Sequence, residues 1–162
     1  MQVGLTIIQN WQMIIGGTMS NAHKTAIKRT SLSKPIRELI ERNLIPDNAS
    51  VLDFGCGRGF DADTLGFDKY DPYFFKRLPD RHYEIIVCNY VLNVIDEQEA
   101  DKVLNSIKEL LLPSGVAYIT VRRDVKRDGV TKTGTYQRNV LLPLPIVKQS
   151  GGFCIYKLTK ES

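Results

Sequence analysis

The chain has 162 residues, of which 43% are hydrophobic, so it is long enough for one domain with a buried core. Its ordinary apolar content and its three cysteines exclude a disordered, a collagen-like or a disulfide-stapled protein. The net charge of +4 is unevenly distributed: residues 19–42 and 122–138 each hold six basic and two acidic side chains, whereas residues 43–121 hold seven basic and thirteen acidic ones. Two basic segments therefore flank an acidic centre.

Helical and strand patterns alternate along the chain. Residues 1–18 are uncharged and precede Met19, so we interpret them as a start-site extension or a loosely held arm, before a single domain at residues 19–162. A helix is expected after Ser33, with Pro35 in its first turn. Apolar runs predict buried strands at residues 50–54, 67–70, 84–89 and 116–121, and apolar spacing predicts a helix over residues 96–112.

The later elements carry clear end signals. Asp96 is placed to cap the helix that it begins, with Glu99 three residues on as in a capping box. Residues 136–144 and 153–158 predict two strands around a Ser-Gly-Gly turn, paired antiparallel. The alternation predicts an α/β layered sheet, mainly parallel, with a hairpin at one edge.

Cysteine usage and hydropathy indicate the compartment. Cys56, Cys88 and Cys154 are odd in number and widely spaced, which argues against a disulfide framework or a zinc site and indicates a reducing, cytoplasmic location. No bound metal is expected. No apolar run reaches the roughly 18–20 residues of a membrane span, so no membrane partner is expected. His23 and His82 have no evident partner and are expected to be exposed.

The most informative stretch is residues 51–59, Val-Leu-Asp-Phe-Gly-Cys-Gly-Arg-Gly. Its alternating glycines, which lack side chains, allow the backbone to approach a ligand closely. Asp53 places a charge in a strand that would otherwise avoid one. Asp71 follows 18 residues later, close to the roughly 20-residue offset at which an acid binds ribose hydroxyls. A nicotinamide dinucleotide is disfavoured, because its pattern needs a glycine where Phe60 stands.

This stretch resembles the first motif of the class I S-adenosylmethionine-dependent methyltransferases. The resemblance implies that Gly55, Gly57 and the backbone at Cys56 pack against the methionine part of S-adenosyl-L-methionine. It also implies that Asp71 takes the ribose hydroxyls, with Asp68 as a second choice. Asp53 would orient the loop or reach the methionine amino group through water. The candidate cofactor-binding residues are Asp53, Gly55, Cys56, Gly57, Gly59, Asp68, Asp71 and Asn89.

Two further stretches extend the resemblance. Residues 86–95 are similar to the family's fourth-strand motif, and residues 96–116 to its next helix, the following loop and the start of its fifth strand. More narrowly, residues 23–26, 31–37, 53–59 and 70–73 resemble putative methyltransferases associated with DNA phosphorothioation systems. The resemblance implies a compact Rossmann-like methyltransferase fold, mainly parallel, with a C-terminal antiparallel hairpin.

The middle of this fold is expected to be shortened between its second and fourth strands. Only twelve residues separate Asp71 from the strand at residue 84, so the third strand and its helix are reduced or missing. The acid that usually meets the adenine amino group then has no counterpart. In the absence of this acid, the hypothesis is that adenine stacks on Tyr73, Phe74 or Phe75.

Asn89 and Tyr90 are the candidate catalytic residues, since they end the predicted strand whose tip faces the transferred methyl in this family. Methyl transfer from a sulfonium is an in-line displacement, so the protein mainly positions the reactants. Asn89 is suited to accept a hydrogen bond from an amino group, and Tyr90 to stack on a flat substrate. Alternatively, Asn89 caps the strand end and Tyr90 is half-buried packing. Cys88 is interpreted as packing.

The second basic segment supplies the candidate substrate residues, which are Arg122, Arg123, Lys126, Tyr136 and Arg138. Basic and hydroxyl side chains around an aromatic ring suit phosphate contacts, so this segment and residues 22–42 together predict a nucleic-acid groove. A solvated charged loop is the alternative interpretation of the segment. The open alternatives for function are a small-molecule acceptor, a protein acceptor, or a non-catalytic cofactor-binding or partner module.

Overall fold

The computed structural model describes residues 22–77 and 79–162, so the predicted arm at residues 1–18 lies outside the described residues. The helices are η1 (Ala22–Thr25), α2 (Lys34–Glu41), α3 (Phe60–Leu65), η2 (Leu92–Val94) and α4 (Glu97–Leu110). The strands are β1 (Val51–Phe54), β2 (Asp68–Tyr70), β3 (Tyr83–Asn89), β4 (Leu111–Arg122), β5 (Gly129–Val130), β6 (Tyr136–Gln137), β7 (Ile146–Gln149) and β8 (Phe153–Thr159).

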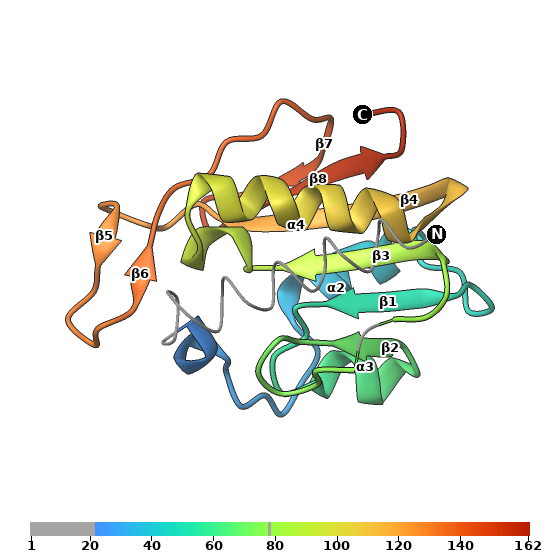
Figure 1. Ribbon diagram of the computed structural model, residues 1–162, viewed down its shortest axis with the longest axis horizontal. Coiled ribbons are helices and arrows are strands. Elements are labelled where there is room, and N and C mark those ends of the chain that lie inside the picture. The colour runs from blue at the N-terminus through green and yellow to red at the C-terminus, as the bar shows by residue number, and fades with distance from the viewer. Residues whose placement is uncertain (1–21, 78) are drawn as a thin grey trace.

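Six strands form one sheet in the order β2-β1-β3-β4-β8-β7 (Figure 1). The first four are parallel, whereas β8 is antiparallel to β4 and β7 is antiparallel to β8. This topology confirms the predicted mainly parallel sheet with a C-terminal hairpin. Within the described part of the chain β2 is an edge strand, so the third strand that the resemblance implies has no counterpart there, which agrees with the expectation that it is reduced or missing.

Helices cover both faces of the sheet and build two apolar clusters. On one face, Val103 and Ile107 of α4 pack with Ile86 of β3. On the other face, Ile36 and Leu39 of α2 pack in a second cluster with residues of β1, β3, β4 and β8. The predicted α4 cap is confirmed, because the carboxylate Oδ1 of Asp96 accepts a hydrogen bond from the Glu99 amide at 2.8 Å.

The predicted strand over residues 136–144 is wrong. Only β6 is a strand there, and it pairs with β5, whereas β8 forms its hairpin with β7. Pro143 has no N–H to donate to a ladder, which helps explain why residues 138–144 form no strand. Helix α4 also ends two residues earlier than predicted, and β4 follows it directly.

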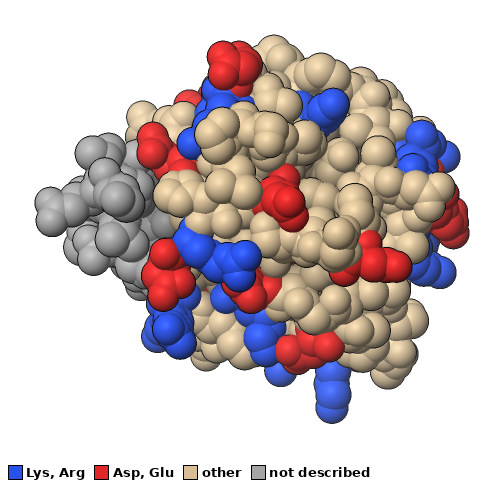
Figure 2. All heavy atoms as spheres, turned by 90° about the vertical axis from the view of Figure 1, so that its right-hand side faces the viewer, with Lys and Arg blue, Asp and Glu red and all other residues tan. Residues whose placement is uncertain are grey.

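The carboxyl ends of the parallel strands β1 and β3 lie on the left in Figure 1. Figure 2 views the opposite side, where these strands begin, and shows basic and acidic side chains mixed over that face. Among the described residues, every helix is too short or too polar to cross a membrane.

Candidate functional site

A pocket of about 740 Å³ lies at the carboxyl ends of β1, β3 and β4. Ligands of open α/β sheets bind at this end, where strand order reverses. The turn after β1, the segment from η1 to α2, the tip of β3 and the end of β4 all contribute to its lining. Its lining includes Asp53, Gly57, Asp71, Asn89, Tyr90 and Arg122.

The glycine turn after β1 is tied to the end of β2. The backbone amides of Gly55 and Cys56 both donate to the Tyr70 carbonyl, at 2.7 and 3.1 Å. Gly55, Gly57 and Gly59 have φ values of +78°, +56° and +84°, in the left-handed region that glycine adopts without strain. A Cβ at Gly55 would also clash with Cγ2 of Val91. The glycines therefore form a cradle that side chains would fill.

Asp71 lies at the mouth of this cradle and is 9% exposed. Its Oδ2 accepts a hydrogen bond from the Gly57 amide at 2.9 Å, and its Oδ1 accepts from the amides of Tyr73 and Phe74 at 2.9 and 3.0 Å. Burial raises the pKa of Asp71, while these three amides oppose that rise. Asp68, the second choice, lies at the other end of β2 and accepts from the Tyr83 hydroxyl at 2.7 Å. Of the two, only Asp71 lines the pocket.

Asp53 lines the pocket and is 4% exposed, and its carboxylate accepts no hydrogen bond from any residue in the described ranges. Burial, together with the neighbouring carboxylates of Asp61 and Asp71, raises its pKa to about 8, against the opposing charge of Arg29. Asp61 instead accepts a hydrogen bond from the Ser33 amide at 2.9 Å and so fixes the start of α2. A cation in the pocket would hold the Asp53 carboxyl in its ionised form.

Asn89 and Tyr90 meet at the pocket wall. Both polar atoms of the Asn89 amide are buried and have no hydrogen-bond partner among residues 22–77 and 79–162. Tyr90 has a φ of +63°, which is rare for a residue with a side chain, and its amide donates to the Thr120 carbonyl at 2.9 Å. Burial raises the pKa of the half-buried Tyr90 phenol. Cys88 is fully buried, as its interpretation as packing requires.

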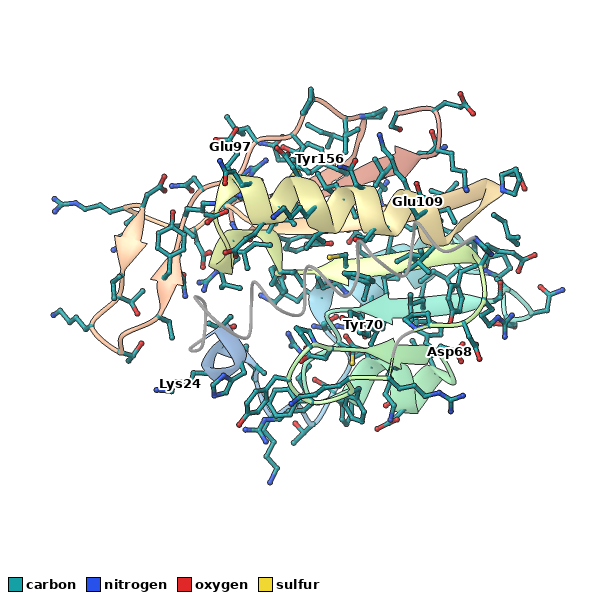
Figure 3. The ribbon with its side chains drawn as sticks, viewed as in Figure 1. Lys24, Asp68, Tyr70, Glu97, Glu109 and Tyr156 are labelled. Carbon is teal, nitrogen blue, oxygen red and sulfur yellow. The ribbon has the colours of Figure 1, made fainter. Side chains whose placement is uncertain are left out.

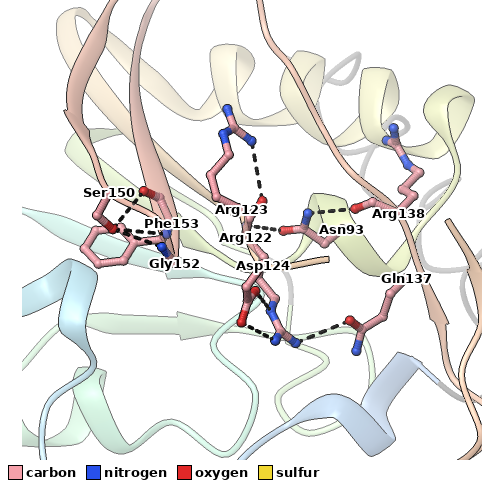
Figure 4. Close-up of polar contacts among 9 residues, drawn as sticks. All are labelled: Asn93, Arg122, Arg123, Asp124, Gln137, Arg138, Ser150, Gly152 and Phe153. Carbon is pink, nitrogen blue, oxygen red and sulfur yellow. Dashed lines mark hydrogen bonds and ion pairs between the residues drawn. The ribbon is translucent and has the colours of Figure 1, made fainter. Parts of the chain in front are cut away.

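The second basic segment contributes less than predicted. The Arg122 guanidinium lines the pocket but is held by both oxygens of Asp124, at 2.8 and 2.9 Å, and by Gln137 (Figure 4). Arg123 points the other way and donates to the Val140 carbonyl at 2.6 Å and to the Tyr156 hydroxyl. Of the five predicted substrate residues, four do not belong to the described pocket lining. They are Arg123, Lys126, Tyr136 and Arg138.

Arg138 is committed to the protein itself, because its Nε donates to the Ile95 carbonyl at 2.6 Å. Sequence reasoning missed Asn93, which is fully buried and organises this region. Its side-chain oxygen accepts from the Arg122 amide at 2.7 Å, and its side-chain nitrogen donates to the Arg138 carbonyl at 2.9 Å. The sequence feature that could have indicated Asn93 is its position as the single amide side chain inside the apolar run at residues 91–95.

The first basic segment borders the same pocket through Arg29 and Lys34. The expectation that His23 is exposed is wrong, because the side chain is partly buried. Its ring stacks on Tyr73 with 3.8 Å between the centroids and 8° between the planes, and both residues line the pocket. Parts of the two basic segments that are far apart in sequence therefore meet at one site.

Several solved structures have folds similar to that of this chain. 1,6-Didemethyltoxoflavin-N1-methyltransferase from Burkholderia thailandensis, with bound 1,6-didemethyltoxoflavin and S-adenosylhomocysteine, has a TM-score of 0.60 at 16% identity, over 92% of this chain and 88% of that one. The DhpI-SAM-HEP complex has a TM-score of 0.54 at 12% identity, over 94% of each chain. TehB from Haemophilus influenzae has a TM-score of 0.50 at 16% identity, over 80% of this chain and 62% of that one.

At these identities the likeness shows a shared fold. A search of curated proteins found no match. A family model described as a methyltransferase domain matches residues 28–141, which is more than half of the chain and includes both the glycine turn and the tip of β3. The chain therefore belongs to the methyltransferase domain family.

Proposed function

We propose that the chain binds S-adenosyl-L-methionine in this pocket and transfers its methyl group to a planar nitrogen acceptor. The observation that carries the proposal is the pairing of Asp71 with the glycine turn, beside the buried carboxyl of Asp53, which has no hydrogen-bond partner among the described residues. When bound, the cofactor would supply a sulfonium methyl: the N–C bond would form as the C–S bond breaks, S-adenosylhomocysteine would leave neutral, and the proton of the acceptor nitrogen would pass to solvent.

The residues present fit this cofactor. A carboxylate has about four acceptor positions, and Asp71 uses two on Oδ1 and one on Oδ2 for backbone amides. One position on Oδ2 remains for a ribose hydroxyl. Asp53 offers a carboxylate to the methionine ammonium, and the cradle of Gly55 and Gly57 admits the ligand close to the backbone. The pocket volume falls within the range of about 300–1,000 Å³ common for ligand sites.

The acceptor follows from Asn89 and Tyr90. The free amide of Asn89 supplies an acceptor oxygen for the N–H of an amino group, and the Tyr90 ring supplies a flat surface beside it. Holding the acceptor nitrogen in line with the methyl group is the main catalytic task of the protein. The acceptor we propose is a base of a nucleic acid. The meeting of the two basic segments and the resemblance to phosphorothioation-associated putative methyltransferases support this choice.

A second candidate is a small planar molecule. It is favoured by the commitment of Arg122 to Asp124, and of Arg123 and Arg138 to internal carbonyls, since these contacts remove cations from the rim. The two candidates share the cofactor site and the acceptor nitrogen, and they differ in whether phosphates are bound.

Two measurements test the proposal. Calorimetric titration with S-adenosylhomocysteine is expected to give one site per chain that weakens at least tenfold in Asp71→Ala and is unchanged in Asp68→Ala. Absence of binding at millimolar ligand would exclude the cofactor. Transfer of labelled methyl is then followed to single-stranded DNA, RNA, proteins and a small-molecule extract. Label in none of these, with cofactor binding intact, would identify a non-catalytic module.

A further inference from the structure

One border of the pocket carries charge of a single sign. Residues 22–37 contain five basic side chains and no acidic one. Four of these side chains, Lys24, Lys28, Arg29 and Lys34, together with Arg58 of the glycine turn, are called the cationic rim. Within the described part of the chain, none of the five forms an ion pair. Four of them are exposed and Arg29 is half-buried, so these charges are available to a ligand.

The cationic rim is continuous with the pocket. Arg29, Lys34 and Arg58 belong to its lining, and Lys24 lies on η1, at the end of the molecule where β1 and β3 stop (Figure 3). The opposite side differs, because basic and acidic side chains alternate there (Figure 2). Phosphates that approach the pocket therefore meet uncompensated positive charge along one border.

Aromatic rings lie among these cations. Tyr73 is 53% exposed and stacks on His23, and the Arg58 guanidinium lies over the Phe74 ring, 5.3 Å from its centroid. A positive groove with aromatic faces is the combination that binds single-stranded nucleic acid, because cations follow the phosphates and bases stack on the rings.

We propose that the cationic rim, with His23 and Tyr73, holds a single strand of nucleic acid so that one unpaired base enters the pocket. This inference rests on the proposed function, since Asn89 and Tyr90 are the residues that would receive the base. Both are at most partly exposed, and the Asn89 amide atoms are buried, so a base stacked inside a duplex cannot reach them. Binding of the strand to the cationic rim itself needs no cofactor.

The test uses the full chain and a fluorescein-labelled single-stranded oligonucleotide of 15 nucleotides, without cofactor, by anisotropy. The rim variant is Lys24→Ala, Lys28→Ala and Arg58→Ala combined. Its matched control removes three exposed lysines elsewhere, as Lys102→Ala, Lys157→Ala and Lys160→Ala combined. Each phosphate contact to a single strand contributes about 0.7 to the salt slope, so the rim variant should lose roughly 100-fold in affinity at 0.1 M salt and about 2 in slope.

Tyr73→Ala is a second variant and keeps every charge. It should lose at least about fivefold in affinity at unchanged salt slope, because it removes stacking alone. Equal losses in the rim variant and its control, or equal affinity of the wild type for duplex and single strand, would overturn the inference. So would absence of binding at 0.05 M salt in a protein that binds S-adenosylhomocysteine. If the protein binds the single strand but does not bind S-adenosylhomocysteine, the proposed function is contradicted while this inference about strand binding stands.

Discussion

The Oδ2 atom of Asp71 accepts a hydrogen bond from the Gly57 amide at 2.9 Å, which joins the end of β2 to the glycine turn after β1. One carboxylate thus organises the backbone of the turn and offers its remaining acceptor position to the pocket. Asp71 therefore affects both the stability of the fold and the affinity for the ligand, and different substitutions of it should change the two by different amounts.

Asp71→Ala removes the acceptor of three backbone amides, at Gly57, Tyr73 and Phe74. We expect its free energy of unfolding to fall by about 1–3 kcal/mol, the cost of leaving such donors unpaired. Asp71→Asn keeps one oxygen and should lose less stability, while both variants lose at least tenfold in affinity for S-adenosylhomocysteine. Urea unfolding and calorimetry measure the two effects. Equal stability of Ala and Asn variants would contradict this account.

Gly55 and Gly66 have nearly equal φ values, +78° and +74°, but different surroundings. A Cβ at Gly66 meets nothing within 4 Å, whereas a Cβ at Gly55 clashes with Val91. Gly66→Ala should therefore cost about 1 kcal/mol of unfolding free energy from backbone strain alone. Gly55→Ala should cost clearly more and also abolish binding of S-adenosylhomocysteine. Equal losses in urea unfolding would show that Val91 moves aside.

Asp53 makes stability depend on pH in an unusual direction. Its pKa is about 8 in the folded chain against an ordinary value of 3.8, so between about pH 4 and 8 the folded state keeps a proton that the unfolded state has lost. The free energy of unfolding should fall as pH rises through this window and level off above it. Asp53→Asn should show a smaller fall in urea unfolding between pH 5.5 and 8.5.

The same carboxyl should make cofactor binding depend on pH. Only the ionised form of Asp53 attracts the ligand's ammonium, so the affinity for S-adenosylhomocysteine should rise from pH 6 to 8 in the wild type. Calorimetry with Asp53→Asn provides the comparison, because that variant should bind weakly at every pH. An unchanged pH dependence would assign the titration to another group.

Asn89 is predicted to serve the reaction rather than the fold. Because neither of its buried amide atoms has a partner in the described structure, Asn89→Ala should change the free energy of unfolding by less than about 0.5 kcal/mol. Methyl transfer should fall at least about tenfold, since the acceptor nitrogen loses its positioning. A large loss of stability with unchanged turnover would support the alternative that Asn89 only caps the strand.

Asn93, in contrast to Asn89, is predicted to serve the stability of the fold. Its side chain joins the end of β4 to the loop after β6 through hydrogen bonds with Arg122 and Arg138. Asn93→Ala takes these partners from the partly buried Arg122 amide and Arg138 carbonyl, so we expect a loss of about 2 kcal/mol in unfolding free energy. Asn105→Ala, at an exposed position of α4, is the control and should cost nothing measurable. Equal effects would show that water replaces the Asn93 amide.

Local patterns predicted most of the fold. The Asp96–Glu99 cap and the parallel strands follow from spacing and from residues whose preferences are local. The failure at residues 136–144 has a local cause as well, since Pro143 argues against a ladder even where β-branched and apolar neighbours favour one.

The site was harder to predict, because it depends on where long side chains end. The sequence indicated Asp53, Asp71, Asn89 and Tyr90, and all four line the pocket. The sequence does not reveal that Arg123 donates to Val140, since that contact depends on a loop 17 residues away. A charge run thus indicates a basic segment without indicating which of its charges remain free.

Among the described residues β2 lies at the edge of the sheet, where open backbone invites pairing with another chain. This edge is only three residues long, and Lys69 in its middle is ion-paired with Asp63 at 2.6 Å. Directly after it the chain turns back, with reciprocal backbone hydrogen bonds between Asp71 and Phe75. The turn that binds the ligand therefore also ends the exposed edge strand early. Little open backbone is left at this edge for another chain to pair with and aggregate.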